Sequence, residues 1–117
     1  MLQNNPSWWG IIQTDWGRIG LILLPIFDNE IYRKKSMLIN TIIDALYLSK
    51  SINARTVSLT GLIPSATNYG KDIIKAIEDK KDLPKITTGH DTTVASIVIN
   101  IQNILHLGGR NIEQEKL

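Results

Sequence analysis

Cysteine is absent from the 117-residue sequence. Its absence excludes disulfide bonds, thiolate nucleophiles, zinc-thiolate sites and haem-thiolate ligation within the chain. A chain without disulfides suits a reducing compartment, so we expect a cytoplasmic protein.

Long apolar runs are missing as well. The two longest, residues 19–27 and 94–107, are too short or too interrupted by side chains such as Asn100 and Gln102 to cross the roughly 30 Å of bilayer hydrocarbon. We therefore expect no membrane span.

The chain has no large excess of either charge, because 13 Lys and Arg against 11 Asp and Glu give a net charge of +2. The densest basic clusters, residues 33–35 and 80–81, lack the interleaved aromatic side chains of nucleic-acid-binding surfaces. We interpret them as solvated helix surface and expect no nucleic-acid partner.

The hydrophobic share of 43% is enough for one ordinary core in a chain of this length, so residues 1–117 are predicted to form a single domain. Two β-prone runs, residues 8–12 and 18–26, flank a turn that contains Asp and Gly and predict a β-hairpin. Residues 30–51 carry apolar side chains at three- and four-residue spacing, which predicts a long helix.

The remaining chain alternates between the two-residue period of strands and the 3.6-residue period of helices. The predicted elements are a strand at 55–61, a loop at 61–70, a helix at 71–80, a strand at 85–88 and a helix at 91–107. The fold class is therefore α/β: an N-terminal hairpin followed by α-β-α-β-α, in a small layered sandwich with a partly parallel sheet.

All three tryptophans, Trp8, Trp9 and Trp16, lie in the predicted hairpin. Two interpretations are open. The favoured one is that they cap one end of the sheet, and the other is that they form an exposed contact surface.

The main candidate site is the polar turn at residues 87–93, where a strand leads into the last helix. First-turn N–H groups lack helical partners and the helix dipole favours negative charge, so this turn suits a phosphate, carboxylate or carbonyl oxygen. The alternative is that Thr88 or Asp91 only caps the helix. The 61–70 loop follows a strand at the edge where open α/β sheets bind ligands. The candidate substrate-binding residues are Gly61, Ser65, Thr67, Tyr69, Thr87, Thr88, Gly89, His90, Asp91 and Thr93.

His90 next to Asp91 suggests a proton-transfer pair. Adjacent residues rarely direct both side chains at one target, so we assign no catalytic residue. His106 is interpreted as a favourable partner of the helix C-terminus. A whole helix separates the two histidines, so no metal site is expected.

The Gly-His-Asp-Thr-Thr turn before an apolar helix resembles the oxygen-activating helix of haem-thiolate monooxygenases, but those enzymes need a cysteine. A resemblance over nearly the whole chain is to the N-terminal substrate-binding lobe of long-chain acyl-[acyl-carrier-protein] reductases and related NAD(P)-dependent dehydrogenases. Its blocks are residues 17–25, the long helix, residues 57–61 with Ser65, and residues 86–89 with Thr93.

This resemblance implies an α/β lobe that contributes to an acyl-substrate site, a Rossmann domain that binds NADPH, and a cysteine elsewhere that carries the acyl group as a thioester. The sequence contains neither the cysteine nor a Gly-x-Gly-x-x-Gly fingerprint. We therefore expect a lobe that is incomplete as an enzyme, binds no cofactor alone and needs a Rossmann-domain partner or downstream domain. An acyl carrier protein or acyl thioester is the implied ligand. The alternatives are a non-enzymatic binding or homo-oligomerisation module and a simple anion-binding domain.

Overall fold

A computed structural model describes residues 5–115, so residues 1–4 and 116–117 of the predicted domain lie outside the described range. The predicted α/β class is confirmed, with a hairpin followed by helices and a parallel strand pair. In order, the elements are β1 (Ser7–Thr14), β2 (Gly17–Leu23), α1 (Asp28–Ile31), α2 (Lys35–Ser51), β3 (Thr56–Ser58), α3 (Ile63–Ala66), α4 (Lys71–Ala76), β4 (Lys85–Thr87), α5 (His90–Leu107) and the 3-10 helix η1 (Ile112–Gln114).

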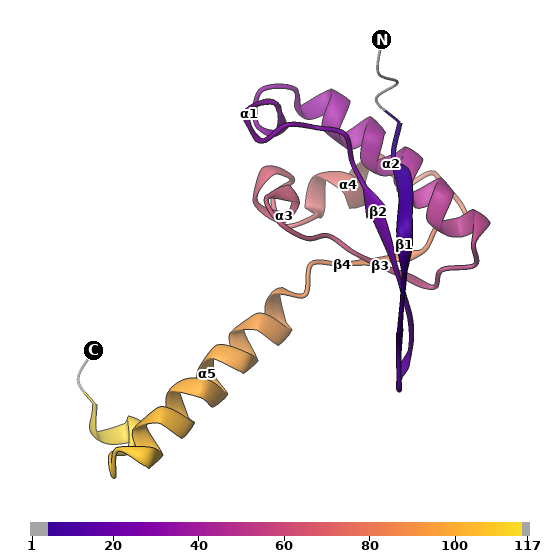
Figure 1. The fold of residues 1–117 in the computed structure, drawn as a ribbon. Helices are drawn as coiled ribbons and strands as arrows, with labels where there is room; N and C mark the ends of the chain where they lie inside the picture. The colour runs from indigo at the N-terminus through magenta and orange to yellow at the C-terminus, as the bar shows by residue number, and fades with distance from the viewer. Residues whose placement is uncertain (1–4, 116–117) are drawn as a thin grey trace.

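The hairpin β1–β2 is antiparallel and forms a sheet of its own, separate from the β3–β4 pair. Thr14 closes its turn by donating a hydrogen bond of 2.8 Å from Oγ1 to the Gly17 carbonyl. A bulge between Trp8 and Gly10 shifts the register, and the Trp8 ring covers Gly20 on the opposite strand. The β1–β2 hairpin crosses in front of the helices, and its turn extends beyond them (Figure 1).

The core lies between α2 and the segments that follow it. Leu38, Ile42 and Leu46 recur at four-residue spacing, so they lie along one face of α2, and all three are buried. They form one apolar cluster with Leu59, Ala66 and Ile73 from the later segments. β3 and β4 pair in parallel, with Val57 opposite Ile86, and both of these side chains pack against the cluster.

Several predicted bounds are wrong. The strand expected at 55–61 covers only Thr56–Ser58, and the helix expected at 71–80 ends at Ala76. Two further differences concern the helices near residues 34 and 64. The helix expected at residues 30–51 is divided into α1 and α2, because Lys34 has non-helical dihedral angles, φ −116° and ψ 56°. The divided helix places Lys35 at the start of α2, where its Nζ lies 2.7 Å from Oδ2 of Asp72. The 61–70 loop contains the short helix α3, since Pro64 is tolerated in the first turn of a helix.

Helix α5 extends away from the core as an isolated rod (Figure 1). None of its residues is buried. Among the described residues, the closely packed pairs of elements are β1 with β2, β3 with β4, α2 with α4, and α5 with η1. Within residues 5–115, no helix combines the length and the apolar character required to span a bilayer.

Candidate functional site

The candidate site lies where the chain leaves the two parallel strands. Because β3 and β4 run side by side in the same direction, the segments after Ser58 and Thr87 emerge at the same edge. The Leu59 N–H donates to the Thr87 carbonyl at 2.8 Å, which continues the pairing one residue beyond β3. The 61–70 loop and the 87–93 turn therefore start from neighbouring points.

The two segments are also in contact further along the chain, at Tyr69 in the loop and His90 in the turn. The rings of Tyr69 and His90 lie 5.4 Å apart, centroid to centroid, at an interplanar angle of 54°. A Cβ atom added at Gly70 would lie 3.6 Å from the Thr88 methyl group, an ordinary van der Waals distance, so the loop passes next to the turn at this point. We call the surface formed by Tyr69, Gly70, Thr88, Gly89 and His90 the strand-end corner.

The backbone at this corner is unusual. Asn68, Tyr69 and Gly70 have consecutive positive φ angles of 51°, 54° and 83°. Only glycine adopts such angles without steric cost, and non-glycine residues held in sparsely populated backbone regions cost about 1–3 kcal/mol each. The strained conformation turns the Tyr69 side chain toward His90, and Tyr69 remains 58% exposed. Strain of this kind is concentrated at ligand-contacting sites, which makes Tyr69 a good candidate for binding.

Three of the four threonine hydroxyls in the 87–93 turn form hydrogen bonds within the turn itself. Oγ1 of Thr87 accepts from the Gly89 N–H at 3.2 Å, and Oγ1 of Thr88 accepts from the His90 N–H at 3.4 Å. Thr93 donates from Oγ1 to the Gly89 carbonyl at 3.1 Å. Two N–H groups of the corner are thus already satisfied, and fewer remain for an anion than the sequence alone indicated.

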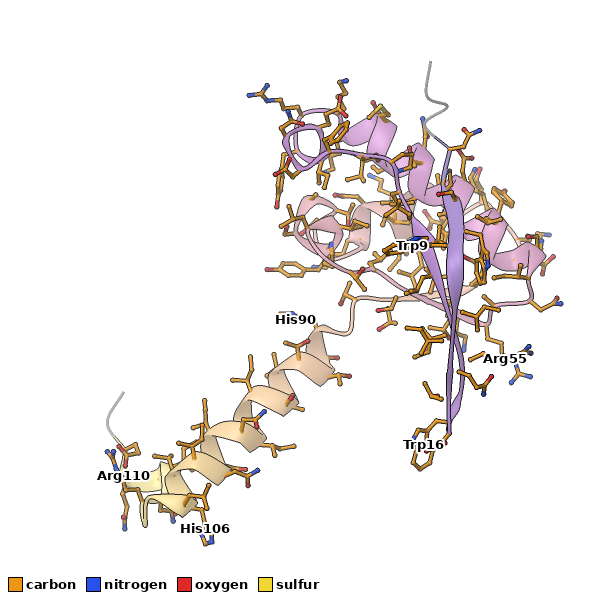
Figure 2. The ribbon with its side chains drawn as sticks, in the orientation of Figure 1. Trp9, Trp16, Arg55, His90, His106 and Arg110 are labelled. Atoms are coloured by element: carbon orange, nitrogen blue, oxygen red, sulfur yellow. The ribbon has the colours of Figure 1, made fainter. Side chains whose placement is uncertain are left out.

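Gly89 supports this arrangement through its backbone. Its φ of 66° is left-handed, and it immediately precedes the first residue of α5. The strand can therefore turn directly into the helix, which brings His90 and Asp91 into the first turn with both side chains exposed. Figure 2 shows His90 at the root of α5, close to the core, and His106 at the far end of the helix.

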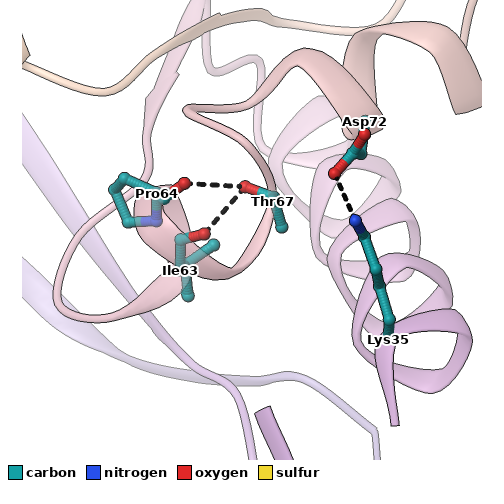
Figure 3. Close-up of polar contacts among 5 residues, drawn as sticks. All are labelled: Lys35, Ile63, Pro64, Thr67 and Asp72. Atoms are coloured by element: carbon teal, nitrogen blue, oxygen red, sulfur yellow. Dashed lines mark hydrogen bonds and ion pairs between the residues drawn. The ribbon is translucent and has the colours of Figure 1, made fainter. Parts of the chain in front are cut away.

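Other predicted site residues have structural contacts instead. Thr67 is fully buried, and its Oγ1 donates to the Ile63 carbonyl at 2.7 Å, while its longer contact to the Pro64 carbonyl is 3.5 Å (Figure 3). The Ser65 hydroxyl lies 2.7 Å from the hydroxyl of Tyr32 and also donates to the Leu62 carbonyl.

Gly61 begins the loop with a φ of 63° and has open space where a side chain would be. Sequence reasoning missed Tyr32, because nothing in its local pattern connects it to a serine 33 residues later.

The strand-end corner is an open wall and not an enclosed cavity. Two hollows on the described residues lie elsewhere. One, of about 550 Å³, is formed by residues 54–56 and 82–85 at the opposite ends of β3 and β4. The other, of about 410 Å³, lies between the end of α5 and η1. Within residues 5–115 no group of three or more His, Asp or Glu side chains is arranged to hold a metal ion.

Comparisons of the chain with known protein families, with curated proteins and with solved structures find no match. Function is therefore inferred from the residues and their geometry.

Proposed function

We propose that the chain is the substrate-binding lobe of an acyl-thioester reductase or a related NAD(P)-dependent dehydrogenase, and that it is incomplete as an enzyme on its own. The observation that carries this proposal is the contact between Tyr69 and His90, because it joins the segments that follow two neighbouring parallel strands. In open α/β sheets, ligands bind at this edge of the strands.

The corner offers chemistry suited to a thioester head group. The ring of Tyr69 and the imidazole of His90 form an apolar and hydrogen-bonding surface, and both are exposed. The thioester carbonyl is a hydrogen-bond acceptor, for which an imidazole N–H is a suitable donor. The acyl chain would need an apolar surface that the corner does not provide alone, which is consistent with one wall of a shared site.

NADPH does not fit the residues of this chain. The sequence contains no Gly-x-Gly-x-x-Gly segment, which is what allows a dinucleotide pyrophosphate to approach the backbone closely. The proposal therefore assigns the hydride donor to a Rossmann-domain partner, and the acyl-bearing cysteine to that partner or another one.

The test is binding of a fluorescent long-chain acyl thioester to the chain, in the presence of a separately produced Rossmann domain from an acyl-thioester reductase. We expect saturable binding that weakens about tenfold in Tyr69→Ala and in His90→Ala, equivalent to about 1.4 kcal/mol. Tyr47→Ala is the matched control, because Tyr47 is an exposed aromatic residue on α2. His106→Ala is the corresponding histidine control. Equal binding by all four variants, or no saturable binding at all, would rule the proposal out.

One observation favours a second candidate function, a non-enzymatic interaction module. α5 and the hairpin carry large apolar side chains that no other described element covers. A third candidate, an anion-binding domain, is less well supported because Thr87 and Thr88 already accept from N–H groups of the turn.

A further inference from the structure

Helix α5 presents an uncovered apolar stripe. Val94, Ile97, Val98, Ile101 and Ile104 share one helix face, and each is between 42% and 67% exposed. A stripe of this kind normally faces a core, because leaving a large aliphatic side chain in water costs about 1.5–3 kcal/mol relative to burying it.

The hairpin has a second uncovered apolar surface. Directly paired residues of an antiparallel ribbon point to the same side, so Ile12, Ile19 and Leu21 share one face. All three are exposed. A two-stranded hairpin is at best marginally stable in water unless it packs against other strands or a helix. The hairpin and α5 therefore each carry an apolar surface that no other described element covers.

The surface area of the chain shows how much is uncovered. A compact monomer of 13.1 kDa is expected to expose about 6,400 Å², whereas this chain exposes 9450 Å². Its radius of gyration is 18.0 Å, compared with about 13 Å for a compact domain of this length. This excess of about 3,000 Å² per chain is more than the roughly 1,000–2,500 Å² that each partner contributes to an obligate dimer interface of about 2,000–5,000 Å² in total.

Charge and size indicate what covers these surfaces. From Thr92 to Leu107 the helix has no Asp, Glu, Lys or Arg, so it has no charge pattern that selects an oppositely charged protein. The stripe from Val94 to Ile104 is about 15 Å long at the helical rise. On the hairpin, the exposed residues Ile19, Leu21 and Leu23 alternate along the same face of β2 and span about 13 Å at the strand rise. The two apolar surfaces of the same chain therefore match in length and in lack of charge.

We propose that the chain forms a two-fold dimer in which the α5 stripe of each copy packs on the Ile12, Ile19 and Leu21 face of the other copy's hairpin. Within one chain this contact is not made, because α5 extends away from the hairpin (Figure 1). A reciprocal exchange covers both surfaces of both copies and gives a closed, self-complementary interface. It goes beyond the proposed acyl-binding function, because it uses a different face from the strand-end corner.

The first experiment measures the mass of the full chain in solution by sedimentation equilibrium. We expect twice 13.1 kDa. Ile97→Asp and Ile12→Asp should each weaken dimerisation about 100-fold or more, because each buries an unpaired carboxylate in an apolar contact. Asn103→Asp, on the opposite face of α5, introduces the same charge and should leave the dimer intact. Far-UV circular dichroism checks that each variant is folded.

A second readout reports on the hairpin alone, since all three tryptophans lie in it or in its turn. Tryptophan emission should shift to longer wavelength in Ile97→Asp, a residue in a different element, and should not shift in Asn103→Asp. A monomeric wild-type chain would overturn the dimer, and so would an Ile97→Asp variant that leaves mass and emission unchanged.

Disulfide trapping separates the exchanged arrangement from a simple pairing of two α5 helices. The chain has no cysteine, so single substitutions react without background. Ile97→Cys mixed with Ile12→Cys should give a covalent heterodimer under mild oxidation. Cross-linking of Ile97→Cys only with itself would contradict the exchange and indicate helix-to-helix pairing. Retained acyl-thioester binding in a monomeric Ile97→Asp variant would show that the proposed function and the dimer are independent.

Discussion

The α2 helix and α5 have nearly the same length, 17 and 18 residues, and both carry a regular apolar stripe. Their surroundings differ completely. Leu46 in α2 is 0% exposed, and Ile104 in α5 is 67% exposed. An amphipathic pattern therefore states that a helix has an apolar face to bury, and it does not state which surface buries it.

The hairpin extends the same comparison to strands. The β3–β4 pair is only three residues long on each side, yet Val57 and Ile86 pack against the core. The hairpin strands are eight and seven residues long, and Trp9 and Trp16 are 74% and 99% exposed. Figure 2 shows the Trp16 ring at the tip of the hairpin, beyond the helical part of the molecule. Trp9 and Trp16 therefore fit the exposed-surface interpretation, whereas Trp8 is 40% exposed and its ring covers Gly20 on the opposite strand.

Leu46→Ala should have the largest effect on stability. It removes a fully buried side chain from the centre of the core cluster, and such truncations cost about 2–5 kcal/mol. Urea unfolding followed by far-UV circular dichroism measures the change. The expected minimum loss in the free energy of unfolding is about 2 kcal/mol. A loss below about 1 kcal/mol would mean that the core is packed more loosely than its burial indicates.

Ile101→Ala in α5 sharpens the contrast with α2. In an isolated monomer it should change the free energy of unfolding very little, because Ile101 is already exposed. In the proposed dimer it should cost about 2 kcal/mol, from the loss of about three buried carbon groups. Unfolding at several protein concentrations distinguishes the two, since only dimer stability depends on concentration.

Tyr69→Gly tests whether the corner is built for binding or for stability. Glycine accepts the φ of 54° without strain, so the free energy of unfolding should rise, or fall by no more than about 1 kcal/mol after loss of the ring contact. Binding of the acyl thioester should be lost in the same variant. A large loss of stability, measured by thermal unfolding, would instead make Tyr69 a structural residue.

Lys35→Ala should have a smaller effect. The ion pair between Lys35 and Asp72 connects α2 to α4 and is partly exposed (Figure 3), so its removal should cost about 0.5–1 kcal/mol. Lys34→Ala is the control, because Lys34 pairs with Glu30 only four residues away, across the junction between α1 and α2, and does not reach α4. Equal costs in urea unfolding would show that the link between α2 and α4 contributes nothing specific.

The smallest expected effect concerns pH. The hydrogen bond from Lys34 lowers the pKa of Glu30 below its ordinary value. A lowered pKa in the folded state stabilises the protein above the unfolded-state pKa, and this contribution is lost as the pH falls through the folded-state pKa. An NMR titration should show the Glu30 pKa rising toward its ordinary value in Lys34→Ala. An unchanged pKa would mean that the pair is not formed in solution.

Local sequence patterns predicted most of the elements. The hairpin, the helix over residues 35–51, the two short parallel strands and α5 all follow from side-chain periodicity and turn residues. The patterns failed at Lys34, where the long helix divides, and at residues 63–66, where a four-residue helix is too short to show a period.

The candidate site was predictable only in part. The turn at residues 87–93 and the loop at 61–70 could be placed at strand ends, and parallel pairing brings them together. The burial of Thr67 and the hydrogen bond between Ser65 and Tyr32 were not predictable, because both depend on contacts with residues that no local pattern connects to them.

The sequence by itself determined which faces are apolar, where the chain turns and that no thiol chemistry is available, because these properties depend on residue identity and short-range spacing. Only the tertiary structure decided which apolar faces meet. α2 is buried because β3, α3 and α4 return beneath it, whereas Gly89 directs α5 away from them. Burial depends on contacts between residues far apart in the chain, and the same periodic pattern in α5 therefore remains open to a second molecule.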